Sequence, residues 1–301
     1  MSDSKFPVRQ SSYKLTIIAW IVTILVSSLP NIVWSELFNS NPEWLSWVKM
    51  GLLFILILLT LFWSPLKPLR KFFILMLALY GLTALLLQIN FNWPFLKKLF
   101  GNNVFDNRMQ AEQTGKLVVS FAMIAILLLL GYKRRDFFLA LGDLHAPIEP
   151  VRVLGFPKPT SWVSFGLQWS IYIAAALGIA QYLSLRPSSA LLLDFVPIIP
   201  SILLYAGLNA FNEEMTYRAP MLATLEPVGG SKNALWMAAY FFGIAHYFGT
   251  PGGILGGVLS IFMGWILSKA MVETRGFFWA WWIHFLSDIV IFSFMTLMLL
   301  K

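Results

Sequence analysis

Long uninterrupted runs of apolar residues recur along this chain. The segments "GLLFILILLTLFW" (51–63) and "FAMIAILLLLGY" (121–132) contain no charged residue. A membrane-spanning β-strand would alternate apolar and polar positions instead. A helix that crosses a bilayer needs about 20 mostly apolar residues in a row. The pattern therefore predicts an all-α fold, a polytopic transmembrane helical bundle.

Nine apolar segments are long enough to be candidate spans. They are residues 15–34, 47–63, 72–90, 117–132, 162–183, 191–212, 234–248, 254–270 and 277–300. The segment 234–248 is short for a span of about 20 residues. We therefore expect nine spans, or eight if one segment lies in the membrane interface, and we interpret the first as a retained helix.

The charges between the segments indicate an orientation, because Lys and Arg gather in cytoplasmic loops. The even-numbered loops are basic, whereas the first loop (35–46) has two acidic residues and no basic one. The third loop (91–116) breaks this alternation with four basic and two acidic residues. The pattern predicts a cytoplasmic N-terminus in a multi-pass protein, and we expect its membrane to be the plasma membrane of a prokaryote.

Composition supports the membrane interpretation and removes some chemistry. Hydrophobic residues make up 58% of the 301 residues and charged residues 12%, against about 25% charged in soluble domains. The mean hydropathy is +0.72. The absence of cysteine excludes disulfides, thiolate metal sites and a thiol nucleophile. The net charge of +8 is attributed to cytoplasmic loops, so the expected partner is the lipid bilayer and not nucleic acid.

Residues 133–161 divide the chain into two parts. The stretch "RRDFFLALGDLHAPIEP" mixes apolar and charged residues before further prolines, which is typical of an interfacial, irregular connector. We expect an N-terminal region, 1–160, with four spans and this connector. The C-terminal region, 161–301, then forms the core that holds all the ionisable residues inside the membrane.

Ionisable residues inside spans are costly and are functional candidates by default. We interpret Asp194, near a membrane boundary, as structural, and give the loop residue His145 little weight. The remaining candidates are Glu213, Glu214, Arg218, His246, His284 and Asp288.

Helical spacing predicts how these residues pair. Glu214 and Arg218 are four residues apart, close enough for an ion pair, while Glu213 points about 100° away. His284 and Asp288 share one helix face, where a carboxylate can fix the tautomer of the imidazole. Each pair alone could be a structural contact, and His246 alone could be a core histidine. Together they offer a base for water and donors for an oxyanion, which predicts hydrolysis. The alternative is a transporter that uses them as a proton or cation relay.

Three short motifs carry a resemblance to a known family. "EEMTYR" (213–218) fits E-E-x-x-x-R, "FGIAH" (242–246) fits F-x-x-x-H, and "HFLSD" (284–288) fits H-x-x-x-N or H-x-x-x-D. Over about residues 190–295 the chain resembles the CPBP family of intramembrane endopeptidases, the Abi, CAAX-protease and bacteriocin-processing family. That family includes the type II CAAX prenyl endopeptidases.

The resemblance implies a role for each candidate. Glu213 would be the general base, acting with His246 on a water, and Glu214 and Arg218 would support it. His284 and Asp288 would stabilise the oxyanion. Because an ionised carboxylate cannot donate a hydrogen bond, Asp288 is expected to orient His284 or to be protonated in a desolvated site.

The resemblance also bears on cofactor and substrate. Glu213, His246 and His284 could hold a zinc ion with an open water position, but no H-E-x-x-H motif is present, so we expect no tightly bound zinc. The implied substrate is a membrane-associated peptide or protein, either lipidated and cut in a CAAX-type cleavage or cut in a leader-peptide cleavage. A catalytically silent immunity or scaffold protein is a third reading.

The predicted boundaries leave one geometric conflict. They place His246 deeper in the membrane than Glu213 and His284. The three can meet only if the segment 234–248 starts later or if "AHYFGTPGG" (245–253) bends inward. Its glycines favour such a bend or close helix packing. We expect the resulting cavity to open toward the cytoplasm.

Overall fold

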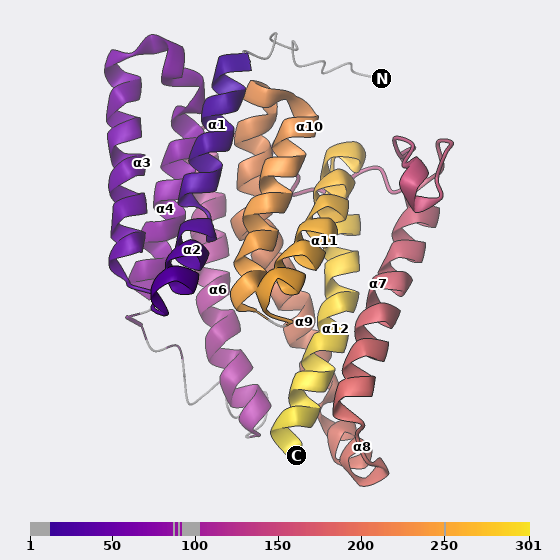
Figure 1. Cartoon of the computed structure of the whole chain (residues 1–301). Helices are drawn as coiled ribbons and strands as arrows, with labels where there is room; N and C mark the ends of the chain where they lie inside the picture. Colours follow the sequence, from indigo (N-terminus) through magenta and orange to yellow (C-terminus); the bar gives the residue numbers. More distant parts are fainter. Residues whose placement is uncertain (1–12, 87, 90, 92–102, 250) are drawn as a thin grey trace.

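A computed structural model describes residues 13–86, 88–89, 91, 103–249 and 251–301 (Figure 1). Within these ranges the fold is helical, apart from two isolated β-bridges in the connector. The all-α prediction is confirmed. The helices are α1 (Tyr13–Val26), α2 (Leu29–Phe38), α3 (Trp44–Phe62), α4 (Arg70–Leu86), α6 (Val104–Leu129), α7 (Trp162–Leu185), α8 (Ser189–Phe195), α9 (Ile199–Glu213), α10 (Ala219–Ala245), α11 (Gly253–Thr274) and α12 (Phe278–Leu300).

The helices are long and apolar enough for a multi-pass membrane protein. Among the described residues, seven helical stretches pass this test, or eight if the pair α1 and α2, bent by 43°, forms one span. One of the seven, Ser189–Phe248, has 60 residues. A straight helix of that length would measure about 90 Å, three times the hydrocarbon core of a bilayer.

That long stretch reverses direction at Gly230. The backbone angles of Gly230 are φ 76° and ψ 163°, inside what is otherwise the helix α10, and glycine adopts such values without a steric penalty. The guanidinium of Arg218 lies 4.5 Å from the ring centroid of Phe242, although a straight helix would separate the two residues by about 36 Å. The arms 219–229 and 231–245 therefore form a hairpin. Along the sequence, the predicted segment 191–212 precedes the tip of this hairpin and the predicted segment 234–248 follows it.

The second arm of the hairpin is short. Its 15 residues, 231–245, measure about 22 Å, less than the roughly 30 Å hydrocarbon core. The chain then turns through a 3₁₀ segment, His246–Phe248, and Figure 1 shows this turn well short of the ends of α6 and α12. A Cβ on Gly256 would lie 2.8 Å from the carbonyl oxygen of His246, so this glycine permits the expected inward bend.

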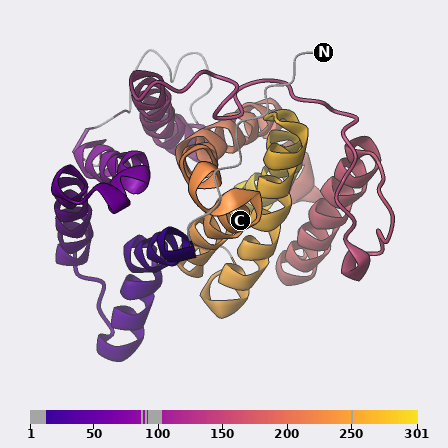
Figure 2. The ribbon, with the colours of Figure 1, turned by 90° about the horizontal axis from the view of Figure 1, so that it is seen from above.

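The hairpin and α11 lie at the centre of the bundle. Seen from above (Figure 2), α1–α4 gather on one side of α10, α11 and α12, and α7 lies on the other. A Cβ on Gly243 would lie 2.2 Å from the backbone nitrogen of Ile261, so α10 and α11 approach each other closely through a small residue. Large apolar side chains such as Phe62 and Leu129, each 87% exposed, face outward as in a lipid environment.

Two predictions about the N-terminal half are wrong. The helix α6 begins at Val104, where the side chain of Asn103 caps it by accepting from the backbone nitrogen of Asp106. Four charged residues assigned to the third loop, Asp106, Arg108, Glu112 and Lys116, therefore belong to a helix, which explains the broken charge alternation. The ionisable residues inside spans are also not confined to the C-terminal half, because Lys49 in α3 is only 6% exposed.

Candidate active site

The motif Glu213–Arg218 lies in the middle of a helix and not at its end. The helix α9 continues through a π-helical turn, Glu214–Arg218, into the first arm of α10. The predicted span end at 212 is therefore wrong. π-turns inside α-helices occur mostly at functional sites. Glu213, just before this one, contacts α6 and faces α12, and Glu214, its first residue, contacts α12.

Glu214 and Arg218 form the predicted ion pair, and both side chains are fully buried. The Nε of Arg218 also donates to the Oγ of Ser268 on α11 at 3.1 Å. Its guanidinium lies over the ring of Phe242, from the second arm of the hairpin. A buried ion pair needs such additional partners to offset the loss of hydration.

His284, on α12, joins the two glutamates. Its Nδ1 lies 2.8 Å from Oε1 of Glu214, a geometry that assigns the Nδ1 proton as the donor to this carboxylate. The Nε2 then lies 3.6 Å from Oε2 of Glu213 and 3.6 Å from Oδ2 of Asp288. These last separations exceed a hydrogen bond, so Nε2 faces both acids without being bonded directly to either.

Two further residues in this cluster are missing from the sequence prediction. The Nζ of Lys116, on α6, lies 3.0 Å from Oε1 of Glu213 and donates to Oδ1 of Asn209 at 2.7 Å. The Nδ2 of Asn209 donates to Oδ2 of Asp288 at 2.9 Å. Asn209 was detectable as a polar residue within the apolar segment 191–212. Lys116 lies one residue before the predicted start of a span and was assigned to a loop.

His246 is the one predicted site residue that stands apart. Its Nδ1 lies 3.1 Å from the carbonyl oxygen of Phe242. No carboxylate oxygen of a described residue forms an ion pair with it within 4.0 Å. The Phe242 ring centroid lies 4.6 Å from that of His246 and 5.8 Å from that of His284. The ring of Phe242 thus contacts both histidines.

Among the described residues, the exposed part of the cluster lies at Glu213 and Lys116. The side chains of Glu213 and Lys116 are 15% and 31% exposed, whereas those of His284 and Asp288 are 4% and 6% exposed. Of the acids Glu213, Glu214 and Asp288, Glu213 is therefore the most exposed.

The arrangement does not match the zinc site considered from the sequence. Among the described residues, no group of three or more His, Asp and Glu side chains is placed to hold a metal ion. His246 stands apart from the other two proposed ligands, and the ammonium of Lys116 occupies one oxygen of Glu213. A cation at that position opposes a second cation on the same carboxylate.

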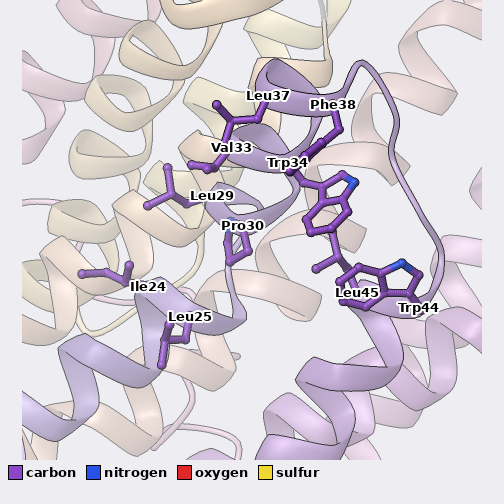
Figure 3. A pocket seen from close by; sticks show the side chains of 10 residues that line it. All are labelled: Ile24, Leu25, Leu29, Pro30, Val33, Trp34, Leu37, Phe38, Trp44 and Leu45. Carbon is purple, nitrogen blue, oxygen red and sulfur yellow. The ribbon is translucent and has the colours of Figure 1, made fainter.

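An apolar groove of about 360 Å³ lies away from these acids, between α1, α2 and α3 (Figure 3). All the residues that line it are apolar: Ile24, Leu25, Leu29, Pro30, Val33, Trp34, Leu37, Phe38, Trp44 and Leu45. On α2, Glu36 accepts a hydrogen bond from the hydroxyl of Tyr247, next to His246. The groove offers no group for catalysis, and its lining suits a hydrocarbon chain.

Comparison with known proteins finds one family model that covers the cluster. Residues 195–290 match the family model described as Type II CAAX prenyl endopeptidase Rce1-like. The matched region contains all six predicted site residues, and it confirms the resemblance drawn from the three motifs. No curated protein and no solved structure matches the chain.

Proposed function

We propose that residues 195–290, as a domain of the Rce1-like type II CAAX prenyl endopeptidase family, make this multi-pass membrane protein an intramembrane endopeptidase. The observation that carries the proposal is the convergence of Glu213, Glu214, His284 and Asp288. Helix α9, the π-turn that follows it and helix α12 bring these groups together, and Glu213 is the most exposed of the four. The family match supports a protease of the CAAX type.

In this proposal Glu213 is the general base. Its Oε1 is held by Lys116 and its Oε2 faces His284, which leaves lone pairs for one water. The water oxygen bonds to the carbonyl carbon of the substrate while Glu213 takes the proton. The C–N bond then breaks as that proton passes to the leaving amine.

The remaining residues stabilise the oxyanion or orient the groups that do. His284 would act as an imidazolium: its Nδ1–H donates to Glu214, and its Nε2–H, which Glu213 and Asp288 face, donates to the developing negative charge. Asp288 accepts a hydrogen bond from Asn209, which favours an orienting role over a donating one. His246 would assist Glu213 in activating the water, and this requires a small movement because the ring of Phe242 lies against it.

The proposed substrate is a membrane-associated peptide or protein, with a lipidated CAAX-type C-terminus or a leader peptide as the two candidates. We further propose that the water is activated without a resident metal ion, because Lys116 already neutralises Glu213. The bond would be cut near the surface of a prokaryotic plasma membrane, in a protein whose N-terminus is cytoplasmic.

Cleavage of a panel of membrane-tethered peptides by the purified protein tests the proposal. The panel contains prenylated CAAX-type peptides and leader peptides, reconstituted in liposomes with wild-type protein, Glu213→Gln or Glu226→Gln. Loss of a general base costs about 10²–10⁴-fold in rate, so Glu213→Gln is expected to lose cleavage to this extent. Glu226, which pairs with Arg275 outside the cluster, is the matched control and its variant should cleave normally.

The same samples separate the alternatives. Absence of cleavage across the panel, together with ion flux that depends on Glu213, would overturn the protease proposal in favour of a transporter. Absence of both activities would favour an immunity or scaffold protein. Zinc at one equivalent per chain, with cleavage lost on chelation and restored by zinc, would contradict the metal-free mechanism.

A further inference from the structure

The helix α6 brings a cation to the proposed base from outside the region that matches the family. Lys116 precedes the matched residues 195–290 and lies 97 residues before Glu213. Its ammonium contacts three oxygens: Oε1 of Glu213 at 3.0 Å, Oε1 of Glu112 at 3.1 Å and Oδ1 of Asn209 at 2.7 Å.

A seam of polar side chains fixes the position of α6 against α9. The Nε2 of Gln113 donates to Asn209 at 2.9 Å, and the Nδ2 of Asn212 donates to Oε1 of Gln113 at 3.1 Å. One turn beyond Lys116, the Oγ of Ser120 lies 2.9 Å from the hydroxyl of Thr216. Hydrogen bonds between polar side chains hold helices together in lipid, so Lys116 enters the cluster from a fixed register.

The two carboxylates that Lys116 contacts are not equivalent. Glu112 lies on the same helix and is 40% exposed, whereas Glu213 is 15% exposed. Exposed ion pairs contribute little, while buried pairs depend strongly on their partner. The contact with Glu213 is therefore the one whose loss leaves a buried charge uncompensated.

Lys116 also reaches the far side of the cluster through Asn209. The side-chain oxygen Oδ1 of Asn209 accepts a hydrogen bond from Lys116. The side-chain nitrogen Nδ2 of Asn209 is therefore directed to Asp288. One ammonium thus fixes the orientation of both acids that flank Nε2 of His284.

We propose that Lys116 is a positioning residue of the reaction centre, which holds Oε1 of Glu213 so that Oε2 faces His284 and the attacking water. The proposal rests on the proposed endopeptidase function. It makes the N-terminal region a contributor to the catalytic geometry and not only a membrane anchor.

Kinetics of Lys116→Met and Lys116→Arg test the proposal. Misplacement of a catalytic group by about 1 Å costs on the order of 100-fold. Lys116→Met is therefore expected to lower kcat by roughly 10- to 100-fold and to change KM by less than about threefold. Lys116→Arg, which keeps a cation, should recover at least a tenth of the wild-type kcat.

The control is Lys49→Met, the same substitution at a buried lysine that contacts Ser27 and Asn31 and no carboxylate of the cluster. It is expected to lower stability and leave kcat per folded molecule unchanged. A wild-type kcat in Lys116→Met, or an equal loss of kcat in Lys49→Met, would overturn the proposal.

A second readout needs no substrate. The substitution Lys116→Met is introduced into the wild-type protein and into the Glu213→Gln variant. It should lower the Tm of the wild-type protein at least twice as much as it lowers the Tm of the variant. Introduced into the Glu112→Gln variant, Lys116→Met should lower the Tm as much as it does in the wild-type protein. Equal shifts in the wild-type and Glu213→Gln proteins contradict the proposal. If no peptide is cleaved, the endopeptidase function fails and the Tm cycle still decides whether Lys116 holds Glu213.

Discussion

At the scale of single residues, the cluster separates its two neighbouring glutamates by environment. Glu214 is fully buried and shared between Arg218 and His284. Glu213 is partly exposed. One of its carboxylate oxygens contacts Lys116, and the other faces His284. Two adjacent carboxylates can therefore have different tasks, one structural and one open to water.

Asp288 occupies the position where the family pattern also allows asparagine, and Asn209 is its partner. We expect Asp288→Asn to keep kcat/KM within about tenfold of the wild type, because the new side chain retains an oxygen that accepts from Asn209. Asp288→Leu and Asn209→Leu each lose that hydrogen bond and leave a buried polar group without it, which costs about 1–3 kcal/mol. Each should lower kcat/KM by roughly 10- to 100-fold.

Peptide cleavage by the three purified variants measures this difference. Equal losses in Asp288→Asn and Asp288→Leu would show that the charge of Asp288 matters and that the hydrogen bond does not.

At the scale of elements, the packing of the hairpin on α11 decides where His246 lies. Gly243 contacts the backbone of Ile261 so closely that a Cβ would lie 2.2 Å from its nitrogen. We expect Gly243→Ala to push the second arm away from α11, to lower the Tm and to reduce cleavage. Gly51→Ala on α3, where no atom lies within 4 Å of the added Cβ, is the matched control.

Thermal unfolding and cleavage assays on both glycine variants check this expectation. A Gly243→Ala protein with the Tm and cleavage rate of Gly51→Ala would mean that the close approach of the two helices is not required.

The sequence predicts the helical elements well because a segment that crosses lipid must be both apolar and helical. All nine predicted apolar segments fall largely on helices in the described residues, since a span has no other way to satisfy its backbone. The start of α6 was missed because its first turns carry charges. Hydropathy cannot distinguish a charged loop from a helix whose charges are paired with another helix.

The site is only partly predictable for a related reason. Spacing of four residues along a helix predicts the pair Glu214–Arg218, and the structure shows it. The contacts of Lys116 and Asn209 depend on how α6 packs against α9. The position of His246 depends on the hairpin at Gly230, and the adjacent pair Gly229–Gly230 marks a break without revealing the change of direction.

At the scale of the whole molecule, the chain can be tested for orientation because it has no cysteine of its own. In the described part of the chain, the three helices α3, α4 and α6 lie between the exposed residues Glu43 and Val153. An odd number of crossings puts these two positions on opposite sides of the membrane. With a cytoplasmic N-terminus, Glu43→Cys faces outward and Val153→Cys faces the cytoplasm.

A membrane-impermeant thiol reagent applied to intact cells should label Glu43→Cys. Val153→Cys should react only after the cells are permeabilised, and the untouched cysteine-free protein gives the background. The reverse pattern would invert the orientation, and labelling of both variants in intact cells would contradict the odd number of crossings.

The contact between Lys116 and Glu213 also has a consequence for how the protein is made. A charged residue at the centre of a helix costs about 2.5–3.5 kcal/mol when it enters the membrane. His284 follows Glu214 by 70 residues, so it has not been synthesised when α9 leaves the ribosome. Lys116, made 97 residues before Glu213, is already available. We therefore expect α9 to pack against α6 first, before the rest of the cluster has been synthesised.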